Sequence, residues 1–395
     1  MRKKLRFMLM IVMVLTLSGC LGKREINDLA MVMAVGIDKG EKEQVKITTQ
    51  IVRPADSRGA TGAPSGQTGD PIWSASAEGE TLFDAIRNLS TFSSRRVFWA
   101  HNYAIVINED YAREGIGDVV DFFTRNPELR MRTWVMVTPD EASKLVSTLT
   151  GLEVIPGEAI NKLFRYNRVS VQAPRTQMID VQSALSIENV EPVIARVSLT
   201  NKGVSNKKPG ESGAFDQIEL KGAGVFRGEK LVGILDGEEV KGMLPFVEKL
   251  ETGLVVLECP TDETKKLSIE LEDHNFQVSP KMEEGKPKFK VDYAVKGSIV
   301  EGDCPLTIKD RPKIENLEKQ MEQQLKAQIE SVVNKAQSEY RADFLEFGNT
   351  FHNRYPAEWK KIKNDWESVF PDVKVETSTE AEITDSTLLI NPTRQ

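Results

Sequence analysis

Cys20 is the residue whose surroundings define a chemistry most clearly. It follows Leu17, Ser18 and Gly19, and this aliphatic, small, small, cysteine pattern resembles a lipobox. At such a site the cysteine thiol receives a diacylglycerol, the chain is cut before the cysteine, and the new amine can be acylated. The sequence therefore predicts lipid attachment at Cys20, with Leu17, Ser18 and Gly19 as the recognition residues.

The residues before Cys20 have the layout of a secretion signal. Arg2, Lys3, Lys4 and Arg6 form a basic start, and the apolar stretch 7–17 that follows is too short to span a bilayer. A cleaved signal without lipid and an uncleaved anchor helix are the alternatives, and the combined features favour lipidation. Two or three acyl chains suffice as an anchor, because each buried methylene contributes about 0.8 kcal/mol.

The composition is that of a globular protein. The chain has 395 residues, 40% hydrophobic and 28% charged, which is enough for two or three domains. Removal of the signal peptide at 1–19 lowers the formal net charge from −7 to −11. An acidic body argues against nucleic acid and against electrostatic binding to anionic lipid. No second apolar run approaches the length of a membrane span, so the lipid on Cys20 is the expected attachment to the membrane.

The two other cysteines, Cys259 and Cys304, each precede a proline near the end of a predicted strand. A disulfide between them is feasible outside the cytoplasm. The sequence does not bring their Cα atoms within bonding reach of each other. We therefore expect two buried free thiols, with the disulfide as the alternative.

No other residues assemble a site for catalysis or metal binding. The three histidines, His101, His274 and His352, lie at no metal-ligand spacing from one another or from a cysteine, and His101 is interpreted as structural. Ser205-Asn-Lys-Lys208 matches a Ser-x-x-Lys acylation motif by letters, but it lies in a polar segment without the partner motifs. The glycines from Gly222 to Gly228 have the wrong spacing for a phosphate loop. We predict no enzyme activity, no cofactor and no metal.

The first half of the chain alternates predicted strands and helices. Apolar runs at 29–37 and 46–52 flank the turn Asp38-Lys39-Gly40 and predict a hairpin, and the glycine-rich segment 57–70 predicts a mobile loop. The further elements expected are strands at 103–107, 131–137 and 193–199, and helices at 82–89 behind an N-cap at Thr81, at 110–124, from Thr138, and at 177–185. This alternation favours an α/β domain over 20–201.

A polar linker at 202–216 and a second domain at 217–395 complete the predicted organisation. Hairpin, helix and strand patterns are expected at 219–226, 230–235, 238–250, 254–257, 265–271, 288–295, 373–376 and 382–390. The strongest helix runs from Ile314 to Phe344, where apolar residues recur every three or four positions. Pro356 opens another helix whose Trp359 and Trp366 are interpreted as core. The predicted fold class is α+β, multi-domain, with mixed or antiparallel sheets, packed helices and a long C-terminal amphipathic helix.

The chain carries an ordered set of short motifs: Glu25-Ile26-Asn27-Asp28, Val35-Gly36-Ile37-Asp38, Lys221–Phe226, Lys230–Gly233, Asp236-Gly237-Glu238, Phe347-Gly348, Tyr355-Pro356, Trp359 and Trp366. Taken together in this order, they resemble the C-subunit family of bacterial spore germinant receptors. Two departures bear on the subfamily. Leu21-Gly22 stands where the family often has Trp-Asp, and Ile234 stands where a hairpin tryptophan is frequent.

The resemblance implies a non-enzymatic lipoprotein on the outer face of the spore inner membrane. It would act with two integral-membrane partners, the A and B subunits, in the nutrient sensing that triggers germination. The resemblance leaves open whether this subunit contacts ligand. The alternative is a solute-binding lipoprotein of a transporter. That class needs two similar α/β lobes around a cleft, and the two halves of this sequence differ.

Overall fold

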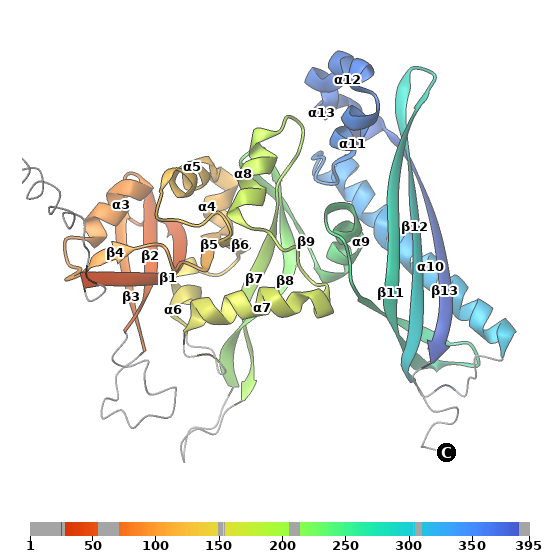
Figure 1. Ribbon diagram of the computed structural model, residues 1–395, viewed down its shortest axis with the longest axis horizontal. Helices are drawn as coiled ribbons and strands as arrows, with labels where there is room; N and C mark the ends of the chain where they lie inside the picture. Colours follow the sequence, from red (N-terminus) through yellow and green to blue (C-terminus); the bar gives the residue numbers. More distant parts are fainter. Residues whose placement is uncertain are drawn as a thin grey trace, which may run out of the picture.

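The computed structural model describes residues 25, 28–53, 71–148, 153, 155–204, 214–302, 304 and 310–386. Cys20 and its lipobox, the predicted loop at 57–70, and Ser205–Lys208 lie outside the described residues. Two sheets organise the rest. We call residues 28–235, which contain the first sheet, the N-terminal lobe, and residues 236–386, which contain the second, the C-terminal lobe (Figure 1).

The N-terminal lobe is built on a nine-stranded mixed sheet. Its strands are β1 (Leu29–Lys39), β2 (Val45–Val52), β3 (Ile72–Gly79), β4 (Arg96–Phe98), β5 (Ala104–Asn108), β6 (Trp134–Thr138), β7 (Val193–Val204), β8 (Ala214–Arg227) and β9 (Lys230–Leu235). The order is β3-β2-β1-β5-β6-β7-β8-β9, with β4 beside the start of β1. The strands β1, β5, β6 and β7 are parallel, as is β4 beside β1, whereas β2, β3, β8 and β9 pair antiparallel. Helices cover both faces of the parallel centre, which explains its continuous apolar runs.

Six helices of the described residues cover this sheet. Packed on one face are α3 (Leu82–Leu89), α4 (Glu109–Glu114), α5 (Gly117–Arg125) and α8 (Met178–Ser186), and on the other are α6 (Ala142–Ser147) and α7 (Pro156–Ser170). The predicted cap of α3 is confirmed, since Thr81 Oγ1 accepts from the Asp84 N–H at 3.2 Å. The single helix predicted at 110–124 is wrong. It breaks at Gly115, where φ is +141°, and the next amide donates to the Glu229 carbonyl at 2.9 Å.

A residue distant in sequence sets the start of α6. The helix predicted from Thr138 begins instead at Ala142, because Thr138 still belongs to β6. The Asp38 carboxylate accepts from the N–H groups of Ala142 at 2.7 Å and Ser143 at 2.8 Å. Gly36 permits this approach, since a Cβ there would lie 2.8 Å from the Ala142 carbonyl carbon. Burial raises the pKa of Asp38, against the lowering effect of these hydrogen bonds.

The segment predicted as a linker, 202–216, joins β7 to β8 within one hairpin, so the first sheet continues to Leu235. Helix α9 (Gly237–Val247) then begins at the N-cap Asp236, whose carboxylate accepts from the N–H groups of Glu238 at 2.8 Å and Glu239 at 2.9 Å. The division of the chain into domains at 20–201 and 217–395 stays a prediction.

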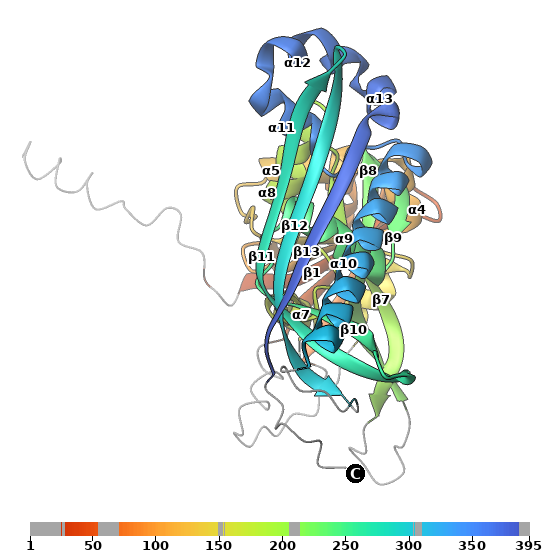
Figure 2. The same ribbon diagram turned by 90° about the vertical axis from the view of Figure 1, so that its right-hand side faces the viewer.

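The C-terminal lobe is a four-stranded sheet with one long helix across it. The strands β10 (Gly253–Cys259), β11 (Asp262–Glu283) and β12 (Lys286–Gly302) form an antiparallel meander, and β13 (Lys374–Ser386) pairs parallel to β12. Helix α10 (Arg311–Asn334) packs against this sheet and continues into a π-helical turn at Lys335–Glu339 (Figure 2). The predicted long helix is confirmed as far as Glu339, whereas Tyr340 to Phe344, predicted as its last turn, lie beyond its end. The strands predicted at 373–376 and 382–390 form one strand up to Ser386, and 387–390 lie outside the described residues.

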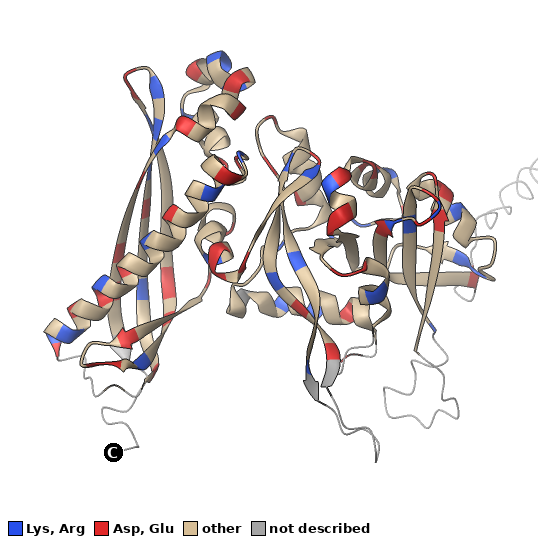
Figure 3. Ribbon diagram, turned by 180° about the vertical axis from the view of Figure 1, so that it is seen from behind, with Lys and Arg blue, Asp and Glu red and all other residues tan. Residues whose placement is uncertain are grey.

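Acidic and basic residues are interspersed along α10 (Figure 3). Beyond it, short helices close the lobe: α11 (Phe347–Arg354), α12 (Pro356–Ile362) and α13 (Trp366–Val369), with 3₁₀ turns at Lys363–Asp365 and Phe370–Asp372. Trp359 and Trp366 are buried between them with ring centroids 5.2 Å apart, which confirms their interpretation as core. The sequence did not predict α7 or α11.

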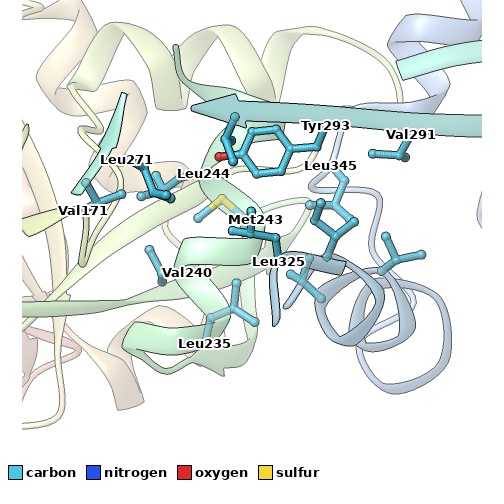
Figure 4. Close-up of a cluster of buried hydrophobic side chains, with 14 of the residues drawn as sticks. Val171, Leu235, Val240, Met243, Leu244, Leu271, Val291, Tyr293, Leu325 and Leu345 are labelled. Atoms are coloured by element: carbon cyan, nitrogen blue, oxygen red, sulfur yellow. The ribbon is translucent and has the colours of Figure 1, made fainter. Parts of the chain in front are cut away.

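One apolar core joins the two lobes, and α9 lies within it. Val240, Met243 and Leu244 of α9 cluster with Leu235 of the first sheet and Leu271 of the second (Figure 4). On the neighbouring helix, Gln328 lies so close that a Cβ at Gly242 would collide with its carbonyl group. Tyr340 packs on Gly233 of β9, and its hydroxyl donates to the Ile234 carbonyl at 2.8 Å. The lobes therefore form one body.

Cys259 and Cys304 form a disulfide, with Cα atoms 5.7 Å apart. The expectation of two free thiols was wrong. The antiparallel meander brings the residues together, because β11 pairs with Cys259 at Asp262 and with Gly302 at Leu267. This contact between residues 45 positions apart was invisible in the local pattern.

Removing the disulfide is expected to destabilise the protein. Cys259→Ser/Cys304→Ser should lower the free energy of unfolding by about 2–5 kcal/mol, because the unfolded chain loses a cross-link. Denaturant unfolding with and without a reductant measures this loss. The reductant should destabilise the wild type and leave the double variant unchanged. Free reactivity of Cys259 and Cys304 with a thiol reagent in the unreduced, unfolded wild type would contradict the assignment.

Candidate functional site: a polar cleft between the lobes

A cleft with a volume of about 600 Å³ lies between the two lobes. The N-terminal lobe contributes α8, the segment before it and the segment after it. The C-terminal lobe contributes the segment after α9 and the start of α11. Polar residues that line the cleft include Arg175, Asp180, Glu191, Glu248 and Glu346.

Arg175 is a lining residue whose side chain has bonding capacity that the described residues leave unused. Its guanidinium carbon lies 5.7 Å from the centroid of the Trp134 ring, in a cation–π contact. Among the described residues its Nε is buried without a hydrogen-bond partner, and its backbone N–H donates to the Glu248 carboxylate. Trp134 is held by stacking on Phe164, with centroids 4.4 Å apart, and by donating from Nε1 to Asn161 at 2.9 Å. The Trp134 ring is therefore held in place, and the Arg175 guanidinium beside it has N–H groups available to donate to a ligand.

Among the charged residues that line the cleft, carboxylates outnumber cations. Five carboxylates face two cations, which gives the cleft a formal charge of −3: Asp180, Glu191, Glu248, Glu251 and Glu346 against Arg175 and Lys249. Several carboxylates serve the local fold. Asp180 accepts from the Gln177 N–H at 2.8 Å, and Glu191 accepts from the Gly228 N–H. Burial raises the pKa of Glu191, against that hydrogen bond. A ligand with only negative charge would be repelled, although a carboxylate in a basic context could reach Arg175.

Asp343 fixes the wall of the cleft that belongs to the C-terminal lobe. It is buried, and its carboxylate accepts from Phe347 N–H at 3.0 Å, Gly348 N–H at 2.6 Å and Trp366 Nε1–H at 2.9 Å. A Cβ at Gly348 would lie 2.8 Å from the Trp366 nitrogen. Burial raises the pKa of Asp343 to about 6 despite the three hydrogen bonds. The sequence pointed to Phe347-Gly348 and Trp366 and missed the carboxylate that they surround.

The three histidines and the glycines from Gly222 to Gly228 do not come together in one site. His274 Nδ1 lies 2.8 Å from the Tyr293 hydroxyl, His352 stacks on Trp359, and His101 lies beside Phe98. Gly222 has a positive φ of +94° within β8. Among the described residues, no three His, Cys, Asp or Glu side chains are grouped to hold a metal ion. In the same part of the chain, the helices are too short or too polar to cross a membrane.

Comparison with known proteins gives a consistent result along the chain. The model described as "Spore germination protein N-terminal domain" matches residues 22–199, and "Spore germination B3/ GerAC like, C-terminal" matches 221–387. Spore germination protein KC of Bacillus subtilis (strain 168) is 29% identical over 402 residues, covering 99% of this chain and 98% of that protein. Spore germination protein B3 of the same organism is 23% identical over 374 residues, covering 93% and 94%.

A solved structure has the same fold. The crystal structure of the GerBC protein superposes with a TM-score of 0.56 at 20% identity, covering 88% of this chain and 96% of that one. Fold and family models together define a spore germination protein. The chain belongs to the C-subunit family of spore germinant receptors. Its two lobes contain different sheets, so the paired similar lobes expected of a solute-binding protein are not found in the described residues.

The pKa of Asp343 predicts an unusual pH dependence of stability. A raised native pKa means that the folded protein binds the proton more tightly than the unfolded chain does. This contribution to stability is full below pH 4 and is lost as the pH rises to about 6. Asp343→Asn removes the titration and places an amide group against N–H donors, costing about 1–3 kcal/mol.

Denaturant unfolding of the wild type, Asp343→Asn and the exposed control Asp372→Asn from pH 4 to 7 tests this prediction. The difference in stability between the wild type and Asp343→Asn should be larger at pH 4 than at pH 7. A difference that stays constant across this range would contradict it.

Proposed function

We propose that this protein is the membrane-anchored lipoprotein subunit of a spore germinant receptor. Lipid on Cys20 holds it on the outer face of the spore inner membrane. It acts there with integral-membrane A and B subunits in the nutrient response that triggers germination. One observation carries the anchor: Cys20 follows Leu17-Ser18-Gly19 and a basic, apolar leader in a chain whose body belongs to this family.

The body acts through contacts with its partners. Anchoring raises its effective concentration near membrane proteins, so modest interfaces suffice. The cleft supports a role in such contacts, because Arg175 is positioned by Trp134 and its guanidinium takes part in no ion pair of the described residues. We infer that Arg175 pairs with a carboxylate on a segment of a partner protein. The other residues of that segment are basic, because carboxylates outnumber cations in the cleft.

Cys20→Ala should release the protein from the spore membrane and weaken germination. Intact mass and membrane fractionation of the wild type and the variant from sporulating cells measure the first effect. Loss of absorbance of a spore suspension after nutrient addition measures the second. Acyl mass on the wild type, with the variant absent from the membrane fraction, is the expected result. Normal membrane retention and germination of Cys20→Ala would contradict the anchor.

Arg175→Gln should slow germination while leaving the stability of the protein nearly unchanged. The variant loses only a cation–π contact of about 0.5–1 kcal/mol, so its unfolding free energy should stay within about 1 kcal/mol of the wild type. The germination rate should fall several-fold, and Arg175→Lys should recover part of it, because charge remains while the planar fork is lost. Arg113→Gln, an exposed arginine on α4, is the matched control. Equal germination rates in Arg175→Gln and Arg113→Gln would remove Arg175 from the proposed interface.

A further inference from the structure

The N-terminal lobe exposes aromatic side chains at one end. Trp73 on β3 is 38% exposed, Phe92 after α3 is 53% exposed, and their rings meet edge to face with centroids 6.4 Å apart. Phe83 on α3 is 55% exposed. The chain has five tryptophans, and the other four are less than 9% exposed: Trp99, Trp134, Trp359 and Trp366. A contiguous exposed aromatic pair indicates contact with another surface.

Strand register places this aromatic pair beside the beginning of the described body. Trp73 pairs with Ile51 of β2, and Ile51 pairs with Val32 of β1, so about 10 Å separate Trp73 from β1 across two strand spacings. Leu29, at the start of β1, pairs with Arg96, four residues after Phe92. In Figure 1, α3, β3 and β4 lie at the end of the molecule far from α10 and the second sheet.

The length of chain before β1 limits the distance from this end to the lipid. Cys20 lies nine residues before Leu29, a span of at most about 30 Å when fully extended. A lipid on Cys20 therefore keeps the aromatic end of the lobe near the membrane surface. This step rests on the proposed function, since it requires the anchor.

We propose that Trp73 and Phe92 insert into the interfacial layer of the bilayer beside the acyl chains of Cys20 and so orient the body on the membrane. Aromatic side chains favour this layer, and the indole N–H of Trp73 can remain hydrated there. The exposed Arg95 follows Phe92 by three residues, and on α3 the Arg87 guanidinium lies 5.0 Å from the centroid of the exposed Phe83.

The turn between β1 and β2 lies at the opposite end of the hairpin. It carries Glu41, Lys42 and Glu43, whose N–H groups all donate to the Glu78 carboxylate. Charges of both signs lie at each end of the sheet, so the proposed orientation rests on the aromatic pair and on the short distance to Cys20.

Tryptophan fluorescence tests the insertion, because Trp73 is the exposed reporter among four buried tryptophans. The full-length lipidated protein is reconstituted into vesicles of phosphatidylcholine and phosphatidylglycerol, with or without bromine on the acyl chains. Bromine quenches a tryptophan only on close approach, so brominated lipid should quench the wild-type emission. In Trp73→Phe the quenching should fall to the level seen with unbrominated lipid.

Two further variants separate insertion from general effects. Phe92→Ser should reduce the quenching of Trp73 at least two-fold, because the neighbouring ring no longer holds the pair in the lipid. Met282→Ser is the matched control, an exposed apolar residue near the tip of the β11–β12 hairpin, and it should leave quenching unchanged.

Flotation with vesicles and intact mass are measured on the same samples. A lipidated protein that floats without quenching would overturn the insertion and leave the anchor in place. A protein without lipid on Cys20 would overturn both. Protection of Trp73 only after co-reconstitution with integral receptor subunits would assign the aromatic pair to a protein interface and refute insertion into lipid.

Discussion

Burial of α9 between two sheets is the constraint on which the rest of the structure depends. Val240, Met243 and Leu244 face a core shared by both lobes, and burying each of these side chains contributes about 1.5–3 kcal/mol. The helix can fill this position because Gly242 allows close approach to α10 and Asp236 satisfies its first N–H groups. Tyr340 of the C-terminal lobe also contacts β9 of the N-terminal lobe, which adds a second connection between the lobes. The cleft exists because this core fixes how α8 faces the C-terminal lobe.

Three buried or capping aspartates explain part of the motifs on which the family resemblance rests. Asp38 holds the start of α6, Asp236 holds the start of α9, and Asp343 holds the start of α11. Each carboxylate accepts from at least two backbone N–H groups, which leaves few unpaired donors at the beginning of a helix. Neighbouring glycines make room for the contacts. These carboxylates therefore hold helix starts in place, and Asp343 also positions the wall of the cleft formed by the start of α11.

The sequence predicted those parts of the fold that depend on local pattern. The helix at Leu82–Leu89, the hairpin at Gly228 and the long apolar stripe of α10 each follow from residues a few positions apart. The errors involve distant partners. Asp38 determines where a helix 104 positions later begins, and the turn at Glu229 breaks the helix around Gly115. The cleft was unpredictable for the same reason, since Arg175 and Glu248 are 73 positions apart, whereas Cys20 stands in a local motif.

The shared core also determines the kind of motion that this protein can transmit. A hinge needs a few residues that absorb rotation between bodies with separate cores. Here α9 belongs to both, so opening the joint would expose Leu235, Val240 and Leu271 together. If the protein is anchored through Cys20 as proposed, the anchor would serve as the pivot of a lever arm. A force on the far end of α10 would then tilt the whole arm, and leverage would grow with the distance between that end and the membrane.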